Sequence, residues 1–166
     1  EISACLVGSE MCIRDRIVRA MLQDGVVDNQ ALATNMDVGL AFVDLAGREV
    51  VFAGAKVALY SSDGESVEQL AGARRAIGDK RLGQYTNASV PLQAGRTFYM
   101  TTDGFLDQAG GEFGYGFGSS RFSDMIRNHA QLPLVEQSRV FSETLAAYQG
   151  DRPQRDDITM LCFRFD

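Results

Sequence analysis

The chain has 166 residues, of which 45% are apolar and 23% are charged, and this composition predicts a single folded domain. The formal net charge of -6 and the pI near 4.8 argue against a general binder of nucleic acid or anionic membranes, because those partners select basic surfaces. No apolar run approaches the roughly 20 residues that cross a bilayer. We therefore expect a cytoplasmic protein that contacts neither nucleic acid nor membrane.

The three cysteines, Cys5, Cys12 and Cys162, have neither zinc-site nor disulfide-framework spacing, so we expect them to be reduced. The stretch SACLVGSEMCIRDR, residues 3–16, has no amphipathic period and no helix cap. It resembles a peptide that arises at the ends of unrelated proteins when sequencing-adapter DNA is translated. We expect residues 1–16 to be a non-native leader, the alternative being an ordinary frayed terminus. The domain then spans residues 17–166.

The first part of the domain predicts a short helix followed by strands. IVRAMLQD, residues 17–24, predicts the helix, and VGLAFVDLAGREVVFAG, residues 38–54, predicts a β-hairpin that turns at Ala46-Gly47. A second hairpin is expected at residues 56–70, turning at Asp63-Gly64. Two further strands follow, which we expect at Tyr85–Val90 and over RTFYMTT, residues 96–102.

Two helices are predicted next. The first is capped by Ser119 or Ser120 and ends near His129, the only histidine, which we expect to pack at the helix end. Its apolar stripe at i, i+3, i+4 and i+7 consists of Phe122, Met125, Ile126 and His129. The second helix starts near Pro133 and ends at Gly150. One face of it carries Leu134, Phe141, Leu145 and Tyr148.

The last predicted strand is DITMLCFRF, residues 157–165. Its alternation places Cys162 on the same side as Ile158 and Met160. We therefore expect Cys162 to be a small core residue.

Acidic residues gather at two strand boundaries. Asp103 and Asp107 follow FYMTT, and Asp156 and Asp157 precede ITMLCFRF. If these strands are antiparallel neighbours, the end of one lies beside the start of the other, and Asp103 and Asp156 converge. Two carboxylates within about 4 to 6 Å repel each other and raise one pKa unless a cation lies between them.

Sites made only of oxygen ligands favour Mg²⁺ or Mn²⁺. Gly104 fits such a site, because glycine lets the chain turn sharply and leaves room for the hydration shell of the ion. The alternative interpretation is that Asp-Gly is a simple turn and Arg-Asp-Asp a solvated start of a strand. The spacing by itself leaves both interpretations open.

Two other features have alternative interpretations. GGEFGYGFG, residues 110–118, suggests a phosphate-binding loop, but it lacks the lysine of a P-loop and suits a mobile flap beside a metal site better. Arg74, Arg75, Lys80 and Arg81 form a local basic cluster. A phosphate or an acidic partner would dock on that cluster, unless it is only a solvated connection.

Three segments occur in a characteristic order: DVGLAFVDLAGREVVFAGAKVALYSSDGESVEQLAGARRAIG, then LQAGRTFYMTTDGFLDQAGG, then QRDDITMLCFRF. Together they resemble the carboxy-terminal portion of the bacterial SpoIIE-like, PPM-type metal-dependent serine/threonine phosphatases. The resemblance spans residues 36–166. Its specificity rests on TDGFLDQAGG combined with the distant DDIT.

The resemblance implies an α+β fold, here a partial PPM-type sandwich of two antiparallel β-sheets flanked by helices. It also implies a binuclear Mn²⁺ or Mg²⁺ site at one edge, to which Asp103, Gly104 and Asp156 would belong. Asp157 would orient a ligand or water, and Asp107 would act through a water. In this family, metal-activated water attacks phosphorus in line without a covalent intermediate.

One departure from the family pattern is clear. The family has an earlier Asp-Gly pair, in a GD-hydrophobic-x-GHG context, that bridges both metals, and nothing before residue 98 resembles it. Asp24-Gly25 and Asp63-Gly64 are interpreted as a helix exit and a hairpin turn. We therefore expect an incomplete domain with weak metal affinity, little activity and a tendency to self-associate, for instance as a homodimer, through open sheet edges.

Three functional hypotheses follow. The first is a phosphatase that acts on a phosphorylated regulatory protein, which in this family is often a STAS-type anti-sigma antagonist. The second is a degenerate PPM-like binding module without catalysis, which a true absence of the upstream acidic motif would favour. The third is a nucleotide-binding regulatory domain, which stabilisation by nucleotide would reveal.

Overall fold

The computed structural model describes residues 35–79, 81 and 83–165. They divide into two compact units. One holds the described residues up to Leu59 together with Leu70–Leu92, and the other holds Tyr60–Gln69 and the residues from Gln93 onward. The expected leader at residues 1–16 and the expected helix at residues 17–24 lie outside the described residues.

The first unit contains a three-stranded antiparallel sheet in the order β1-β2-β5. Strands β1 (Val38–Asp44) and β2 (Glu49–Ala55) form the predicted hairpin, in which Asp44 pairs with Glu49. The amide of Gly47 donates to Asp44 Oδ1 at 2.8 Å and so closes the turn. The hairpin prediction is confirmed.

The third strand of this sheet, β5 (Ala88–Pro91), begins later than the sequence predicted. Tyr85, expected to start the strand, is instead a buried core residue whose hydroxyl donates to the carbonyl of Ala76 at 3.1 Å. Aromatic residues are common both in strands and in loops that pack on the core, so the sequence pattern placed the start of this strand three residues too early. The core of this unit consists of Val51, Ala53, Ala55, Ile77 and Tyr85.

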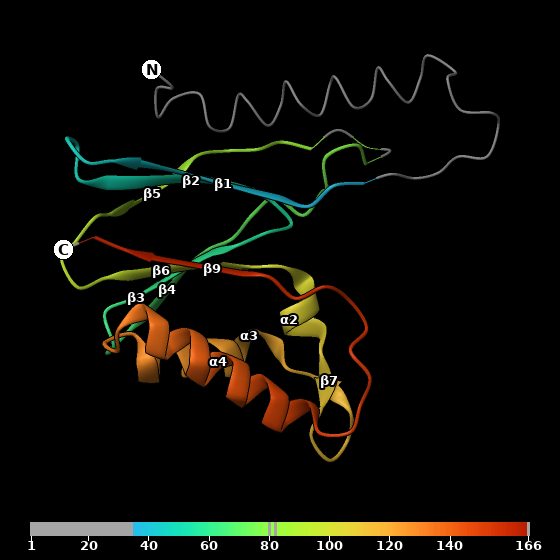
Figure 1. The fold of residues 1–166 in the computed structure, drawn as a ribbon. Helices are drawn as coiled ribbons and strands as arrows, with labels where there is room; N and C mark the ends of the chain where they lie inside the picture. Colours follow the sequence, from blue (N-terminus) through green and yellow to red (C-terminus); the bar gives the residue numbers. More distant parts are fainter. Residues whose placement is uncertain (1–34, 80, 82, 166) are drawn as a thin grey trace. The chain divides into compact units, whose positions relative to one another are not determined.

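A second antiparallel sheet has the strand order β4-β3-β6-β9 (Figure 1). Its strands are β3 (Leu59–Ser62), β4 (Val67–Leu70), β6 (Thr97–Thr101) and β9 (Met160–Arg164). The central strands are the most buried because each of them has a partner on both sides. The predicted second hairpin and the predicted strand at residues 96–102 are confirmed. The last predicted strand is present, but it begins at Met160 and not at Asp157.

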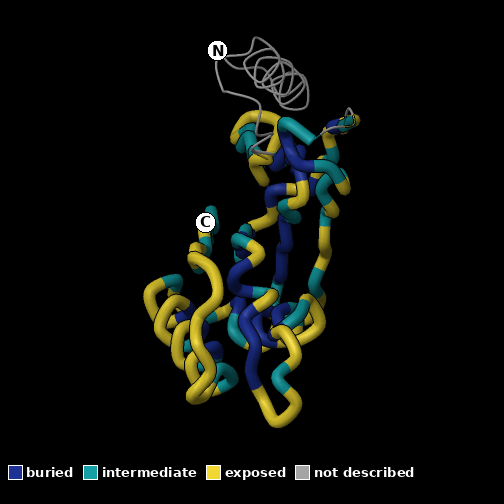
Figure 2. Tube along the Cα trace, turned by 90° about the vertical axis from the view of Figure 1, so that its right-hand side faces the viewer, coloured by how far each residue is buried: buried dark blue, intermediate teal, exposed yellow. Residues whose placement is uncertain are grey.

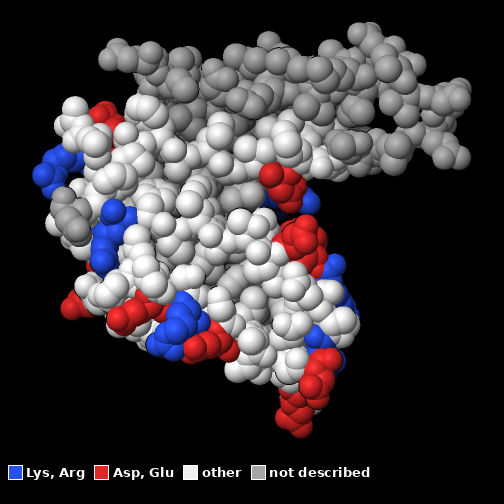
Figure 3. Space-filling model, viewed as in Figure 1, with Lys and Arg blue, Asp and Glu red and all other residues white. Residues whose placement is uncertain are grey.

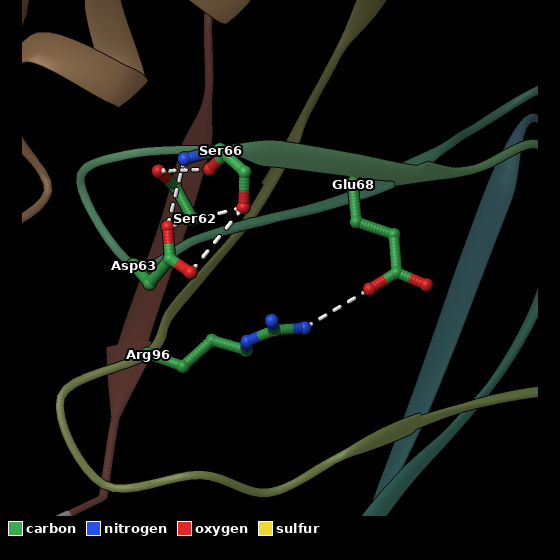
Figure 4. A network of polar contacts seen from close by, with 5 residues as sticks. All are labelled: Ser62, Asp63, Ser66, Glu68 and Arg96. Atoms are coloured by element: carbon green, nitrogen blue, oxygen red, sulfur yellow. Dashed lines mark hydrogen bonds and ion pairs between the residues drawn. The ribbon is translucent and has the colours of Figure 1, made fainter.

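The turn between β3 and β4 is held by its own side chains (Figure 4). Asp63 Oδ1 accepts hydrogen bonds from the amides of Ser66 at 2.8 Å and Glu65 at 3.0 Å, and these bonds hold the pKa of Asp63 below its usual value. Gly64 has a φ of 95°, a conformation that suits glycine. Beyond the turn, Arg96 pairs with Glu68 at 2.9 Å. The interpretation of Asp63-Gly64 as a hairpin turn is therefore confirmed.

Two helices, α3 (Gly118–His129) and α4 (Leu134–Gln149), lie together on one face of the second sheet (Figure 1). Phe122 of α3 meets Tyr60 of β3 edge to face at 5.0 Å, and Phe141 of α4 meets Tyr99 of β6 at 6.0 Å. The predicted stripe is confirmed, with its three apolar members buried. His129 packs against Phe141, as expected.

The predicted cap of α3 is wrong. The helix begins at Gly118, its N-cap is Phe117, and no side chain caps it. Ser119 and Ser120 lie exposed in the first turn. Gly118, with a φ of 78°, is the first helical residue, two positions before the helix would begin if Ser119 were its cap. For α4, the predicted start near Pro133 and the end at Gly150 are confirmed.

The chain therefore has the expected α+β class, with antiparallel sheets and helices. In Figure 2 buried and exposed stretches alternate along the trace, and strands β2, β3 and β6 are mostly buried. Within residues 35–79, 81 and 83–165, no helix has the length and apolar character that spanning a membrane requires.

Candidate metal centre

The short helix α2 (Asp103–Asp107) directly follows strand β6 and carries two of the predicted site residues. Asp103 is its first residue and Asp107 its last, so the two lie about one helical turn apart. Both are exposed, whereas Gly104 and Phe105 between them are buried. The strand therefore ends in an acidic residue that faces solvent.

The second acidic pair lies at the start of the neighbouring strand. Strand β9 pairs antiparallel with β6, with Met160 opposite Thr101. The pairing continues beyond the strands, where the amide of Thr102 donates to the carbonyl of Thr159 at 3.0 Å. Asp156 and Asp157 therefore lie beside the end of β6. The prediction that the two acidic segments are neighbours is confirmed.

At Gly104 the two segments approach each other closely. A β-carbon at this position would lie 2.5 Å from the carbonyl oxygen of Asp157 and 3.3 Å from the β-carbon of Asp156. Gly104 lies within α2 and is not among the glycines with positive φ. The expectation that glycine serves a sharp turn here is therefore wrong, because what requires it is the lack of space beside Asp156 and Asp157.

The four aspartates offer an exposed, oxygen-only set of donors. None of them forms an ion pair with a described lysine or arginine. The carboxylate of Asp156 accepts the amide of Asp157 at 2.7 Å, which fixes it close to its own backbone. Because hard divalent cations prefer oxygen ligands and retain water, these donors fit Mn²⁺ or Mg²⁺ in kind.

The donors do not reach the number that a complete site needs. In the part of the chain that the structure describes, no three histidine, cysteine or carboxylate side chains gather closely enough to hold an ion. The assignment of Asp103, Gly104 and Asp156 to a metal site, with Asp157 and Asp107 beside it, stays a prediction.

The glycine-rich segment forms a small hairpin of β7 (Ala109–Gly110) and β8 (Tyr115–Gly116). It lies against α2, because a β-carbon on Gly116 would be 3.0 Å from the carbonyl of Leu106. Tyr148 of α4 anchors it by donating its hydroxyl to the carbonyl of Tyr115 at 2.9 Å. The hairpin lies next to the acidic helix, where the flap was expected.

The predicted basic cluster is partly neutralised. Arg75 pairs with Asp79 at 3.3 Å, Arg74 is exposed, and Lys80 lies outside the described residues. On the face in Figure 3, lysine and arginine side chains are interspersed with aspartate and glutamate side chains.

Sequence reasoning missed Thr102, whose hydroxyl links the two acidic segments. It donates to the carbonyl of Asp157 at 3.0 Å and accepts the amide of Thr159 at 3.0 Å. The sequence analysis included Thr102 only as the last residue of the predicted strand at residues 96–102. No sequence signal pointed to bonds with residues more than fifty positions away.

Comparison with known proteins agrees with this geometry. The sequence profile of the family described as Stage II sporulation protein E (SpoIIE) matches residues 15–166. The chain belongs to the SpoIIE family. Its domain is therefore a PPM-type phosphatase domain, and the predicted family is confirmed. Among curated proteins, no sequence matches the chain.

Three solved structures are similar to this member of the SpoIIE family. The SiaA-PP2C domain of Pseudomonas aeruginosa is 58% identical, with a TM-score of 0.86 over 96% of this chain and 61% of that one. The phosphatase domain of SpoIIE from Bacillus subtilis is 13% identical, with a TM-score of 0.64 over 100% of this chain and 75% of that one. RsbX in complex with magnesium is 15% identical, with a TM-score of 0.54 over 89% and 60%. The chain thus spans less than two thirds of the SiaA domain that it matches.

Proposed function

We propose that the domain to which this chain belongs removes phosphate from serine or threonine of a regulatory protein, using Mn²⁺ or Mg²⁺. The observation that carries the proposal is the contact between TTDG and RDDIT at the paired ends of β6 and β9. This contact places exposed carboxylates from two distant parts of the sequence at one end of a rigid sheet.

In this proposal Asp103 and Asp156 are the metal ligands. Gly104 lets the two acidic segments approach closely, Asp157 orients a ligand or water, and Asp107 acts through water at the far end of α2. A divalent cation held there would supply a water of lowered pKa and neutralise phosphoryl charge. That RsbX was solved in complex with magnesium supports the choice of a hard divalent ion.

The proposed partner is a phosphorylated regulatory protein, such as a STAS-type anti-sigma antagonist. A folded protein of this kind would present its phosphorylated side chain to the solvent-facing end of β6, where the aspartates are exposed. Self-association into a homodimer is part of the same proposal.

We further propose that the 166-residue chain by itself binds metal weakly and turns over slowly. Among its described residues fewer than three candidate ligands converge, and a binuclear site needs more. The same observation favours a second candidate function, a binding module that recognises the phosphoprotein without hydrolysing it.

Phosphate release from a phosphoserine protein tests the proposal. The chain would be assayed alone and joined to the part of the SiaA domain that it does not cover. We expect Mn²⁺-dependent turnover in the joined protein, a loss of at least about 100-fold in Asp103→Asn and in Asp156→Asn, and normal turnover in the exposed control Asp151→Asn. Joined protein that stays inactive with Mn²⁺ would favour the binding module, and activity retained in both asparagine variants would contradict the ligand assignment.

A further inference from the structure

Thr102 occupies the N-cap position of α2 but does not cap it. Its φ of -68° and ψ of 160° are those of an N-cap residue, yet no side-chain hydrogen bond to the helix is present. A threonine hydroxyl in this position ordinarily accepts an amide of the first helical turn and so stabilises the helix. Here the hydroxyl is used elsewhere.

The hydroxyl of Thr102 replaces a backbone carbonyl in the pairing of β6 with β9. The carbonyl of Thr102 accepts the amide of Phe105 at 3.3 Å and so begins the helix. The amide of Thr159, opposite it, donates to the hydroxyl of Thr102 instead, and the same hydroxyl donates to the carbonyl of Asp157. One residue therefore starts the helix that carries Asp103 and also holds the segment that carries Asp156.

Thr102 and Gly104 fix the same carbonyl from two sides. The carbonyl of Asp157 accepts the hydroxyl of Thr102 at 3.0 Å, and it lies 2.5 Å from where a β-carbon of Gly104 would be. The hydrogen bond holds the segment with Asp156 and Asp157 against the start of α2, and the missing side chain of Gly104 lets that segment come so close.

We propose that Thr102 is a positioning residue that sets the separation of Asp103 and Asp156 and thereby the affinity of this end of the sheet for a divalent cation. The inference rests on the proposed function. Groups that orient metal ligands typically change affinity by about 10- to 100-fold when removed. A hydroxyl that bonds both the strand and the segment carrying a ligand is such a group.

The test is a titration of the ¹⁵N-labelled chain with Mn²⁺, which broadens amide signals near the ion even when binding is weak. In the unmutated chain we expect the amides near residues 103–107 and 156–159 to broaden first. Thr102→Val keeps the shape but removes the hydroxyl, and we expect half-broadening to need at least about tenfold more Mn²⁺. Thr102→Ser keeps the hydroxyl and should stay within about threefold of the unmutated chain.

Thr97→Val is the matched control. Thr97 is the first residue of β6, the strand that Thr102 directly follows, and its buried hydroxyl donates to the carbonyl of Ala130 at 3.2 Å, at the opposite end of the strand from the aspartates. We expect this variant to lose thermal stability and to keep its Mn²⁺ midpoint. A purely structural role for Thr102 would give the same result for Thr102→Val and would overturn the proposal.

A measurement on the unmutated chain covers the case in which Thr102→Val does not fold. By linkage, an ion that binds the positioned arrangement must stabilise it. Saturating Mg²⁺ should therefore slow hydrogen exchange at the amide of Thr159, and unchanged exchange there would overturn the proposal.

If Asp103→Asn and Asp156→Asn titrate as the unmutated chain does, the ligand assignment itself fails, and the role of Thr102 fails with it. If both asparagine variants lose binding while Thr102→Val does not, only the role of Thr102 fails.

Discussion

At the scale of single residues, Gly104 has no room for a side chain beside the second acidic segment. Replacing it with alanine would place a methyl group 2.5 Å from the backbone oxygen of Asp157, which cannot move aside without disturbing the pairing of β6 and β9. We expect Gly104→Ala to cost about 1–3 kcal/mol of unfolding free energy. Gly47→Ala is the control, because its new methyl group meets only the side chain of Asp44, which can move at the cost of its exposed hydrogen bond to the amide of residue 47, and it should cost less than about 1 kcal/mol. Urea unfolding of both variants measures the difference, and equal losses would contradict this explanation of Gly104.

Cys162 gives a pH dependence at the same scale. Burial raises the pKa of its thiol from 9.0 to about 11, so the folded state favours the neutral thiol more than the unfolded state does. This contribution to stability is complete below pH 9 and is lost as the pH rises through 11. Between pH 9 and 11, the unmutated chain should therefore lose stability faster than Cys162→Ala. Parallel stability curves from urea unfolding over that range would show that the thiol is not desolvated.

At the scale of elements, α4 is joined to the second sheet by a buried polar contact. Gln137, which is fully buried, accepts the hydroxyl of Tyr99 at 2.9 Å and donates to the carbonyls of Ala130 at 3.1 Å and Leu132 at 2.8 Å. Gln137→Leu takes this partner from the buried hydroxyl of Tyr99, whereas the two carbonyls keep Thr97 or Arg164 as donors, and we expect a loss of about 1–3 kcal/mol. Ser138→Ala, at the exposed neighbouring position, should change little. Thermal unfolding followed by circular dichroism compares the two, and similar midpoints would show that Gln137 is not needed to hold the helix.

The individual elements also show which parts of the fold can be predicted from the sequence. Local signals sufficed for the hairpins at Gly47 and Gly64, for the stripe of α3 and for the end of α4, because turn residues and periodicity act over a few positions. These local signals did not predict the start of β5, because Tyr85 packs in the core and bonds to Ala76 instead of joining the strand. They also did not predict the start of α3, which begins at Gly118 without a side-chain cap. The sequence analysis considered the antiparallel pairing of β6 with β9 only as a possibility. It did not predict why residue 104 must be glycine, because that depends on contact with a segment more than fifty residues away.

At the scale of the whole molecule, the chain belongs to a phosphatase family and covers 61% of the SiaA domain that it matches. Its described residues carry one acidic pair from each of two segments, and the antiparallel pairing of two strands makes those segments neighbours. Everything proposed for catalysis depends on that juxtaposition binding a divalent cation.

The most direct test is to locate Mn²⁺ on the unmutated 166-residue chain by the order in which its amide signals broaden. We predict that signals near Asp103 and Asp156 broaden first and that Asp103→Asn removes this preference. Broadening that begins at another acidic group, such as the turn at Asp63, or that occurs everywhere at once, would contradict the assignment of a metal centre to the paired ends of β6 and β9.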